Sequence, residues 1–292
     1  MRREIKTALG RLLHAGGLHR RMMHDKAVVL LFHRVDDRFP GDPITCSRRE
    51  FADYCGFLRR HYDVVTLEQL LRDLRAGADV SGRVVITFDD GYRDNYEAAA
   101  PELERHGLPA TFFIATELIG STRVPWWDEK LPVPAEWMSW EQVRVLGERF
   151  EIGAHTMNHV DLGEVDAEEA WREITGSRDR LAAELGRAPR YFSYPYGRPT
   201  QITERNRDLV RRAGFDCCLS AYGGAVSAGS DLFRIQRMPI SPWYVSAAHA
   251  GFEMARVERD ASARGPRQVE RRTRGRSAGS EWEGFDRRLA LR

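Results

Sequence analysis

The chain has 292 residues, of which 42% are hydrophobic, and its formal net charge is +2. This apolar content supports a sizeable core and excludes a wholly disordered chain. The charge is uneven, because residues 256–292 contain eleven Arg against six acidic residues. The four cysteines form no CxxC pair. We therefore expect buried free thiols in a reducing compartment.

Residues 1–25 are predicted to form a basic amphipathic helix. Their apolar side chains recur at helical spacing with Arg and Lys between them, at Ile5, Leu9, Leu12 and Leu13. Two interpretations remain open: the helix lies on an anionic membrane surface, or it packs its leucine face against the rest of the fold. Charged residues interrupt any signal-peptide core, and no apolar run could cross a bilayer. We therefore expect a protein that is cytoplasmic or peripheral to the inner face of the membrane.

From residue 26 onward, strand-like runs alternate with helical stretches. The predicted strands are residues 27–32, 84–88, 110–115, 150–154, 191–194, 215–220 and 234–240. The predicted helices are residues 51–60, 66–74, 96–106, 140–149, 168–185 and 202–213. Ser47 and Glu50 predict a capping box before the first of these helices. The alternation favours a mainly parallel sheet with right-handed crossovers, curled into a closed or slightly open barrel.

The boundaries of this unit follow from where the periodicity stops. We expect one domain over residues 26–254, after the N-terminal helix of residues 1–25. From about Arg256 the apolar periodicity disappears, and residues 255–292 are predicted to be an Arg-rich, disordered tail. The basic tail is not accompanied by a base-reading module, so no nucleic-acid partner is expected.

Two short motifs carry the chemistry. Thr87-Phe88-Asp89-Asp90-Gly91 places adjacent carboxylates where a predicted strand ends, and residues 155–159 read His-Thr-Met-Asn-His after another such strand. Either motif alone is weak evidence, because loop acids and core histidines are common. Together they provide two imidazoles and one carboxylate for a metal, plus a second carboxylate for base chemistry. The combination predicts a metal-assisted hydrolase.

These motifs and the later Phe-Ser-Tyr-Pro-Tyr-Gly of residues 192–197 resemble those of polysaccharide deacetylases, the NodB-homology group of carbohydrate esterase family four. The resemblance covers roughly residues 28–240 and implies a distorted (β/α) barrel of about seven parallel strands. It implies that one divalent metal, commonly zinc in this family, is bound by Asp90, His155 and His159. Asp89 would be the catalytic base. Tyr196 would give its backbone amide to an oxyanion hole and to substrate binding, in a loop shaped by Pro195 and Gly197.

The chain departs from the family pattern at the group that orients the base and at the general acid. Many members carry Arg where this chain has Ser193, and a late Leu-x-His string is missing. The early string Phe32-His33-Arg34-Val35 resembles one branch of the family. We therefore hypothesise that Arg237 orients Asp89, and that His33 lies near the metal, either as the acid or as a structural contact.

Trp126 and Trp127 lie in a proline-rich segment and have two interpretations. Their rings could stack on the apolar faces of pyranose rings in the substrate, or they could hold the loop to the barrel.

The sequence as a whole predicts a metal-dependent hydrolase that removes N-acetyl groups from an N-acetylated polysaccharide or a glycolipid-linked sugar. Two alternatives remain open. The chain could be a catalytically silent carbohydrate-binding module of the same fold, or a deacylase of a non-sugar amide.

Overall fold

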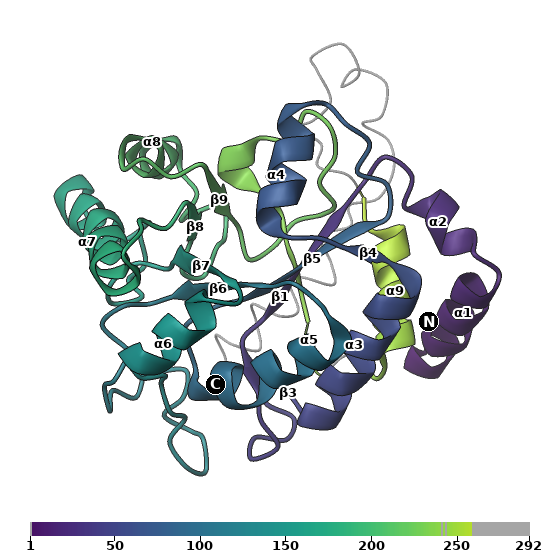
Figure 1. Cartoon of the computed structure of the whole chain (residues 1–292). Helices are drawn as coiled ribbons and strands as arrows, with labels where there is room; N and C mark the ends of the chain where they lie inside the picture. The colour runs from purple at the N-terminus through teal and green to yellow at the C-terminus, as the bar shows by residue number, and fades with distance from the viewer. Residues whose placement is uncertain (1, 241, 243, 259–292) are drawn as a thin grey trace.

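The computed structural model describes residues 2–240, 242 and 244–258. A curled parallel sheet lies at the centre, and helices surround its outer side (Figure 1). The predicted tail lies mostly outside the described residues, so its expected disorder stays a prediction. Among the described residues, no helix is both long and apolar enough to span a bilayer. All four cysteines are free and buried, as expected.

The sheet follows one path of seven parallel strands. In spatial order these are β10 (Met238–Pro239), β1 (Val28–Phe32), β5 (Arg83–Phe88), β6 (Thr111–Ile114), β7 (Glu151–Ala154), β8 (Tyr191–Ser193) and β9 (Cys217–Leu219). β4 (Asp63–Val64) adds to the start of β5 outside this path. A bridge between Leu219 and Ile235 brings the two ends of the path together. The predicted distorted barrel is confirmed.

Most predicted helices form close to their expected bounds. They are α3 (Arg48–His61), α4 (Leu67–Arg75), α5 (Ala100–His106), α6 (Trp140–Gly147), α7 (Ala167–Leu185) and α8 (Glu204–Arg212). α3 begins with the expected capping box, in which Ser47 and Glu50 satisfy each other's backbone N–H groups. A π-helical turn, η1 (Asn95–Ala99), precedes α5, and a 3₁₀ turn, η2 (Leu232–Arg234), precedes β10. Two short strands, β2 (Arg34–Val35) and β3 (Thr45–Cys46), pair apart from the main sheet.

Alternation along the strands separates two cores. Val28, Leu30 and Phe32 of β1 face the surrounding helices, whereas Val29 faces the inside of the barrel together with Val85 of β5. The four leucines of α4 pack against this inner core. Glu151, the first residue of β7, accepts hydrogen bonds from the first backbone amides of α4. α4 therefore closes the amino-terminal end of the barrel and leaves the carboxyl end open.

Three further helices form a layer at one side of the barrel. They are α1 (Arg3–Ala15), α2 (Leu18–Met22) and α9 (Ala247–Arg256). α9 was not predicted, because its alanine-rich sequence has no clear apolar period. α1 and α2 lie at the outside of the molecule (Figure 1).

Candidate metal centre and active site

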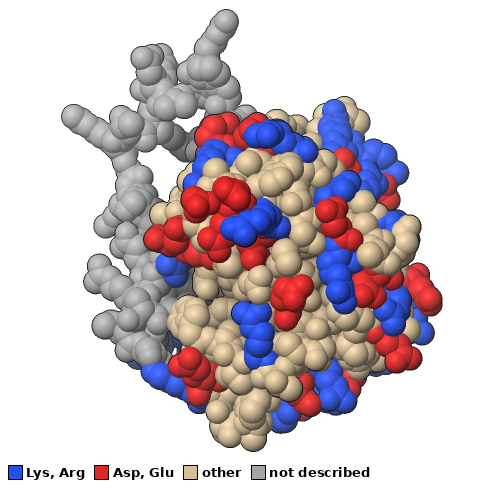
Figure 2. All heavy atoms as spheres, turned by 90° about the vertical axis from the view of Figure 1, so that its left-hand side faces the viewer, with Lys and Arg blue, Asp and Glu red and all other residues tan. Residues whose placement is uncertain are grey.

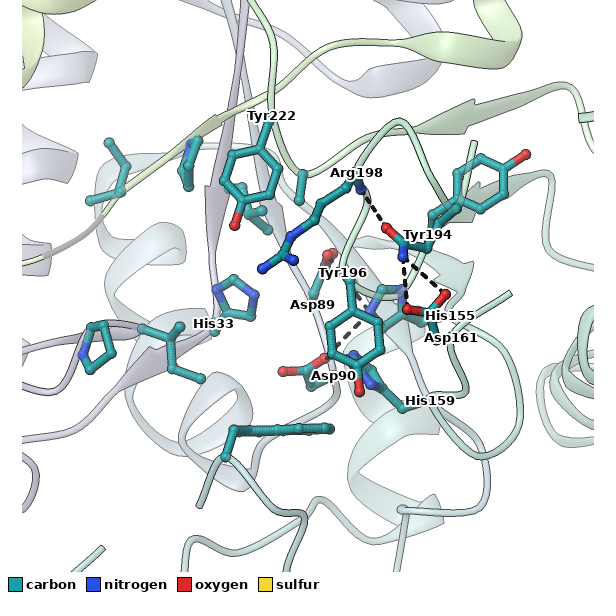
Figure 3. A pocket seen from close by; sticks show the side chains of 18 of the residues that line it. His33, Asp89, Asp90, His155, His159, Asp161, Tyr194, Tyr196, Arg198 and Tyr222 are labelled. Carbon is teal, nitrogen blue, oxygen red and sulfur yellow. Dashed lines mark hydrogen bonds and ion pairs between the residues drawn. The ribbon is translucent and has the colours of Figure 1, made fainter. Parts of the chain in front are cut away.

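The carboxyl ends of the parallel strands surround a cavity of about 420 Å³. Side chains from both predicted motifs, from the segment after β1 and from the segment after β8 converge on it (Figure 3). The predicted residues that line it are His33, Asp89, Asp90, Trp126, Trp127, His155, His159 and Tyr196. This is the end of an α/β barrel at which functional groups are expected.

Asp89 and Asp90 both line this cavity, although they are consecutive residues. Consecutive residues of a regular extended strand would point to opposite sides. Asp90, however, has a φ of 76°, and Gly91 follows with a φ of 94°. The left-handed turn directs the Asp90 carboxylate into the same cavity as Asp89.

Backbone strain is concentrated at this site. Five non-glycine residues of the described chain have positive φ, and four of them belong to the motif loops: Asp90, Thr156, His159 and Tyr196. Such conformations cost about 1–3 kcal/mol each and persist only where the surrounding structure enforces them. The sequence gives little sign of them, because none of these residues is glycine.

The three residues expected to bind metal lie together. The Nε2 atoms of His155 and His159 are each 3.3 Å from Oδ1 of Asp90, and candidate ligand atoms of all three residues lie within 4.8 Å of one another. Oδ1 of Asp90 is buried and has no hydrogen-bond partner among the described residues. A buried carboxylate oxygen without a donor, facing two imidazole nitrogens, fits a divalent cation.

A second set of contacts orients these ligands. Nδ1 of His155 lies 2.7 Å from the carbonyl oxygen of Ser193. Donation from Nδ1 to this carbonyl leaves Nε2 with its lone pair for a metal. The buried Glu173 of α7 accepts hydrogen bonds from the backbone amides of Met157 and Asn158 at 2.9 and 2.8 Å, and so fixes the loop between the two histidines. Glu173 could not be identified from the sequence, because one acid within a charged helix carries no signal.

Asp89 is held by Arg237 through two parallel hydrogen bonds. Nη1 donates to Oδ1 at 2.8 Å and Nη2 donates to Oδ2 at 2.7 Å. Arg237 Nη2 also donates to the Ser193 hydroxyl, which in turn donates to Asp89 Oδ2. Arg237 thus lies against Asp89, as hypothesised, and Ser193 joins the same network; the orienting role of Arg237 stays a prediction.

The charge state of Asp89 follows from these neighbours. Burial alone raises the pKa of this carboxyl group, but Arg237 and His155 outweigh burial and hold its pKa below the usual value. Asp89 is therefore ionised at neutral pH and can accept a proton.

His33 extends from the end of β1 into the cavity, on the side facing Asp89 and Asp90 (Figure 3). Nδ2 of Asn95 donates to its carbonyl oxygen at 2.7 Å, which anchors the backbone. Burial lowers the pKa of His33, and the negative charges of Asp90 and Asp89 offset this only in part. The position is compatible with either hypothesised role, so both remain predictions.

The loop after β8 brings Tyr196 to the cavity. Tyr196 and Gly197 have φ values of 60° and 57°. A Cβ atom at Gly197 would lie 2.1 Å from the backbone nitrogen of Ala221, so only glycine fits there. Pro195 accepts a hydrogen bond from the Gly197 amide at 2.6 Å, but it does not line the cavity. Pro195 therefore shapes the turn, and its predicted contact with substrate stays a prediction.

The two tryptophans occupy different environments. The Trp127 ring lies 4.5 Å from the His159 ring, and its Nε1 donates to the hydroxyl of Tyr92 at 2.9 Å. Trp126 is 55% exposed and donates to the hydroxyl of Tyr196 at 3.2 Å. Trp127 thus lines the cavity and also holds the loop in place, while Trp126 is available to a ligand.

A buried ion pair fixes this loop. Arg34 is fully buried and pairs with Asp128, the residue after Trp127, and with Asp42 at 2.7 Å. The Tyr92 hydroxyl also donates to Asp128. Arg34 belongs to the string of residues 32–35, but its ion pair with Asp128 could not be identified from the sequence.

Other residues that line the cavity could not be identified from the sequence either. They are Asp42, Asp161, Arg198, Gln201 and Tyr222 among others, each from a loop without a recognisable motif. Gln201 donates to both carboxylate oxygens of Asp161 at 2.9 and 2.8 Å, which ties two of these loops together.

Comparison with known proteins agrees with this geometry. The family model for polysaccharide deacetylase matches residues 77–218, which include all three motifs. The putative polysaccharide deacetylase YxkH of Bacillus subtilis is 24% identical over 230 residues, which cover 78% of this chain and 76% of the relative. The poly-beta-1,6-N-acetyl-D-glucosamine N-deacetylase of Staphylococcus epidermidis is 24% identical over 237 residues, covering 74% of this chain and 80% of the relative.

Two solved structures share the fold. IcaB from Ammonifex degensii superposes with a TM-score of 0.64 and 28% identity, covering 78% of this chain and 97% of that one. The Streptococcus pyogenes deacetylase PplD superposes with a TM-score of 0.66 and 21% identity, covering 77% and 96%. The family model covers neither His33 nor Arg237, so its match does not bear on these two residues.

Proposed function

Since this chain belongs to the polysaccharide deacetylases, we propose that it removes acetyl groups from the amide nitrogens of an N-acetylated polysaccharide or a glycolipid-linked sugar. The observation that carries the proposal is the pairing of Asp89 with Arg237 beside a three-residue metal centre in one open cavity. A silent binding module has no need for a buried, ionised carboxylate next to metal ligands.

The residues divide the chemistry between them. Asp90, His155 and His159 would hold one divalent cation, which we propose to be zinc because two imidazoles and a carboxylate suit it. When bound, such a cation supplies Lewis acidity and makes water more acidic. Asp89, fixed by Arg237, accepts the proton from the attacking water.

The remaining groups act on the amide. The Tyr196 N–H makes no backbone hydrogen bond within the described residues and would donate to the oxygen that becomes negative as the carbonyl is attacked. The departing sugar nitrogen then needs a proton, and we propose that His33 supplies it. Trp126, exposed at the rim, would stack against a sugar ring.

The experiment combines metal analysis with acetate release from N-acetylglucosamine oligomers. We expect about one equivalent of divalent metal in the purified protein and acetate release that falls by about 10²–10⁴-fold in Asp89→Asn, with the metal retained. Asp208→Asn, at an exposed position, is the matched control.

Three outcomes would contradict parts of the proposal. Metal binding without acetate release from any acetylated glycan would favour the binding module, and activity only on a small non-sugar amide would favour the deacylase. If His33→Ala keeps turnover within a few-fold of the unmodified protein, His33 is a structural contact and not the acid.

A further inference from the structure

The N-terminal helix exposes its apolar side chains to solvent. Ile5, Leu9 and Leu12 are 48%, 38% and 71% exposed, and they form a single stripe because they lie at positions i, i+4 and i+7 of α1. Leu18 of α2 adds a fourth apolar side chain that is 49% exposed. The side chains of Ile5, Leu9 and Leu12 therefore do not pack against the rest of the fold, which was one of the two interpretations left open.

α1 is nevertheless firmly attached, through a different face. Gly10 lies so close to α9 that a Cβ atom there would be 2.0 Å from the carbonyl oxygen of Ala248. Lys6 forms an ion pair with Glu253 at 2.8 Å, and the hydroxyls of Thr7 and Ser246 are 3.1 Å apart. The apolar stripe is thus held in a fixed orientation by a packed helix.

The surroundings of the stripe are basic. Residues 2–22 contain six Arg or Lys and one acidic residue. The five arginines among them are all exposed: Arg2, Arg3, Arg11, Arg20 and Arg21. The face over α6, α7 and α8, in contrast, carries acidic and basic side chains interspersed (Figure 2). Apolar and cationic side chains therefore gather on the two N-terminal helices.

We propose that α1 and α2 form a docking surface for an anionic lipid bilayer. Such a surface inserts its apolar stripe at the boundary between headgroups and acyl chains, while arginines contact lipid phosphates. This inference is independent of the proposed catalytic activity. It keeps the membrane interpretation of residues 1–25, with the addition that α1 packs on the fold through a different face.

Charge disfavours two other occupants of the stripe. A second copy of the chain would bring two arginine-rich rims together, which is repulsive. Residues 259–292 of this chain contain ten Arg and five acidic residues, so this segment is also basic. An anionic partner surface complements the stripe and its rim, whereas a cationic one does not.

The test is vesicle co-sedimentation of the full chain. We expect binding to vesicles of phosphatidylethanolamine with phosphatidylglycerol, weak binding to phosphatidylcholine alone, and loss of binding as salt increases. The triple variant Ile5→Gln/Leu9→Gln/Leu12→Gln should lose at least about tenfold in vesicle affinity. Its acetate release from soluble oligomers should be unchanged. The double variant Val124→Gln/Val133→Gln, which changes similarly exposed valines in the loop between β6 and α6, should bind like the unmodified chain.

Each contrary result overturns the proposal. Equal vesicle binding by the triple variant would assign binding to another basic segment, such as the C-terminal one. No binding of the unmodified chain to anionic vesicles would remove the membrane as the partner. A concentration-dependent dimer in sedimentation velocity that disappears in the triple variant would identify a second copy as the occupant.

Discussion

Two regions, the carboxyl end of the barrel and the N-terminal helical layer, depart in opposite ways from the usual burial of apolar side chains and exposure of charged ones. The first buries charges such as Asp89, Asp90 and Arg237 and forces four non-glycine residues into positive φ. The second exposes the apolar side chains of α1 that a packed helix normally hides. Departures from local consistency are expected at functional sites. In this molecule buried charge gathers at the chemical site, and the exposed apolar surface of α1 is the place where we propose contact with a membrane.

The strongest test of this contrast is the loss of Arg237. Arg237→Met would leave the Asp89 carboxylate buried without its two hydrogen bonds, and removal of one partner of a buried pair costs about 3–5 kcal/mol in the free energy of unfolding. We also expect acetate release to fall by about 10²-fold, because the base loses its orientation. Denaturant unfolding and steady-state assays measure the two effects.

Two variants control this experiment. Arg234→Met changes an exposed arginine nearby and should alter neither quantity. The double variant Ser193→Arg/Arg237→Ser moves the guanidinium to the position where many family members carry it, and part of the turnover should return. Full activity of Arg237→Met would show that Asp89 needs no such partner.

We expect the stability of the N-terminal layer to depend on pH through His14. His14 lies between α1, α2 and α3, facing His19, His61 and Tyr62. Burial lowers the pKa of His14 from 6.5 to about 4, the Gly10 carbonyl opposes this in part, and His19 and His61 lower it further. Arg20 and Arg60 add positive charge beside His61.

The sign follows from the lowered pKa. The unfolded chain binds a proton at His14 below about pH 6.5, while the folded chain resists it until about pH 4. The free energy of unfolding is therefore unaffected by His14 above pH 6.5. It decreases by about 2–3 kcal/mol as the pH falls from 6.5 towards 4. His14→Gln should make the free energy of unfolding less dependent on pH over this range, measured by denaturant titration. His24→Gln, at an exposed position, should keep the dependence of the unmodified chain.

A smaller effect is expected where α7 supports the metal centre. Glu173→Ala removes the acceptor for the Met157 and Asn158 amides, so the loop that carries His159 loses its anchor. Outer contacts of this kind typically change metal affinity by about 10–100-fold. Competition with a chelator measures this, with Asp179→Asn, an exposed acid of the same helix, as control. Unchanged affinity would mean that the loop is held by its own backbone geometry.

How far the sequence predicts this molecule depends on whether the signal is local. The barrel strands and the α3 capping box follow from short patterns in the chain, and so does the proximity of Asp90, His155 and His159, because parallel strands end at one edge. The direction of Asp90 does not follow, because its left-handed turn depends on packing around it. The sequence also contains no sign of three long-range contacts: those of Glu173, those of Asp128, and the packing of α1 on α9. Each depends on a partner far away in the sequence, which periodicity cannot identify.

The smallest predicted effect concerns the rim of the cavity. Here the carboxyl end of the barrel resembles the N-terminal layer, because Trp126 exposes an apolar ring to solvent. If Trp126 stacks on a sugar ring, Trp126→Ala should raise KM for N-acetylglucosamine oligomers by about 5–10-fold, the equivalent of roughly 1 kcal/mol of stacking, with little change in kcat. Trp127→Ala should lower kcat as well, because the Trp127 ring packs on the His159 ring. Steady-state kinetics across oligomer lengths separates these outcomes. Equal effects on kcat from both variants would show that Trp126 supports the loop and contributes no subsite. The exposed Trp126 ring would then not be a contact for a sugar ring.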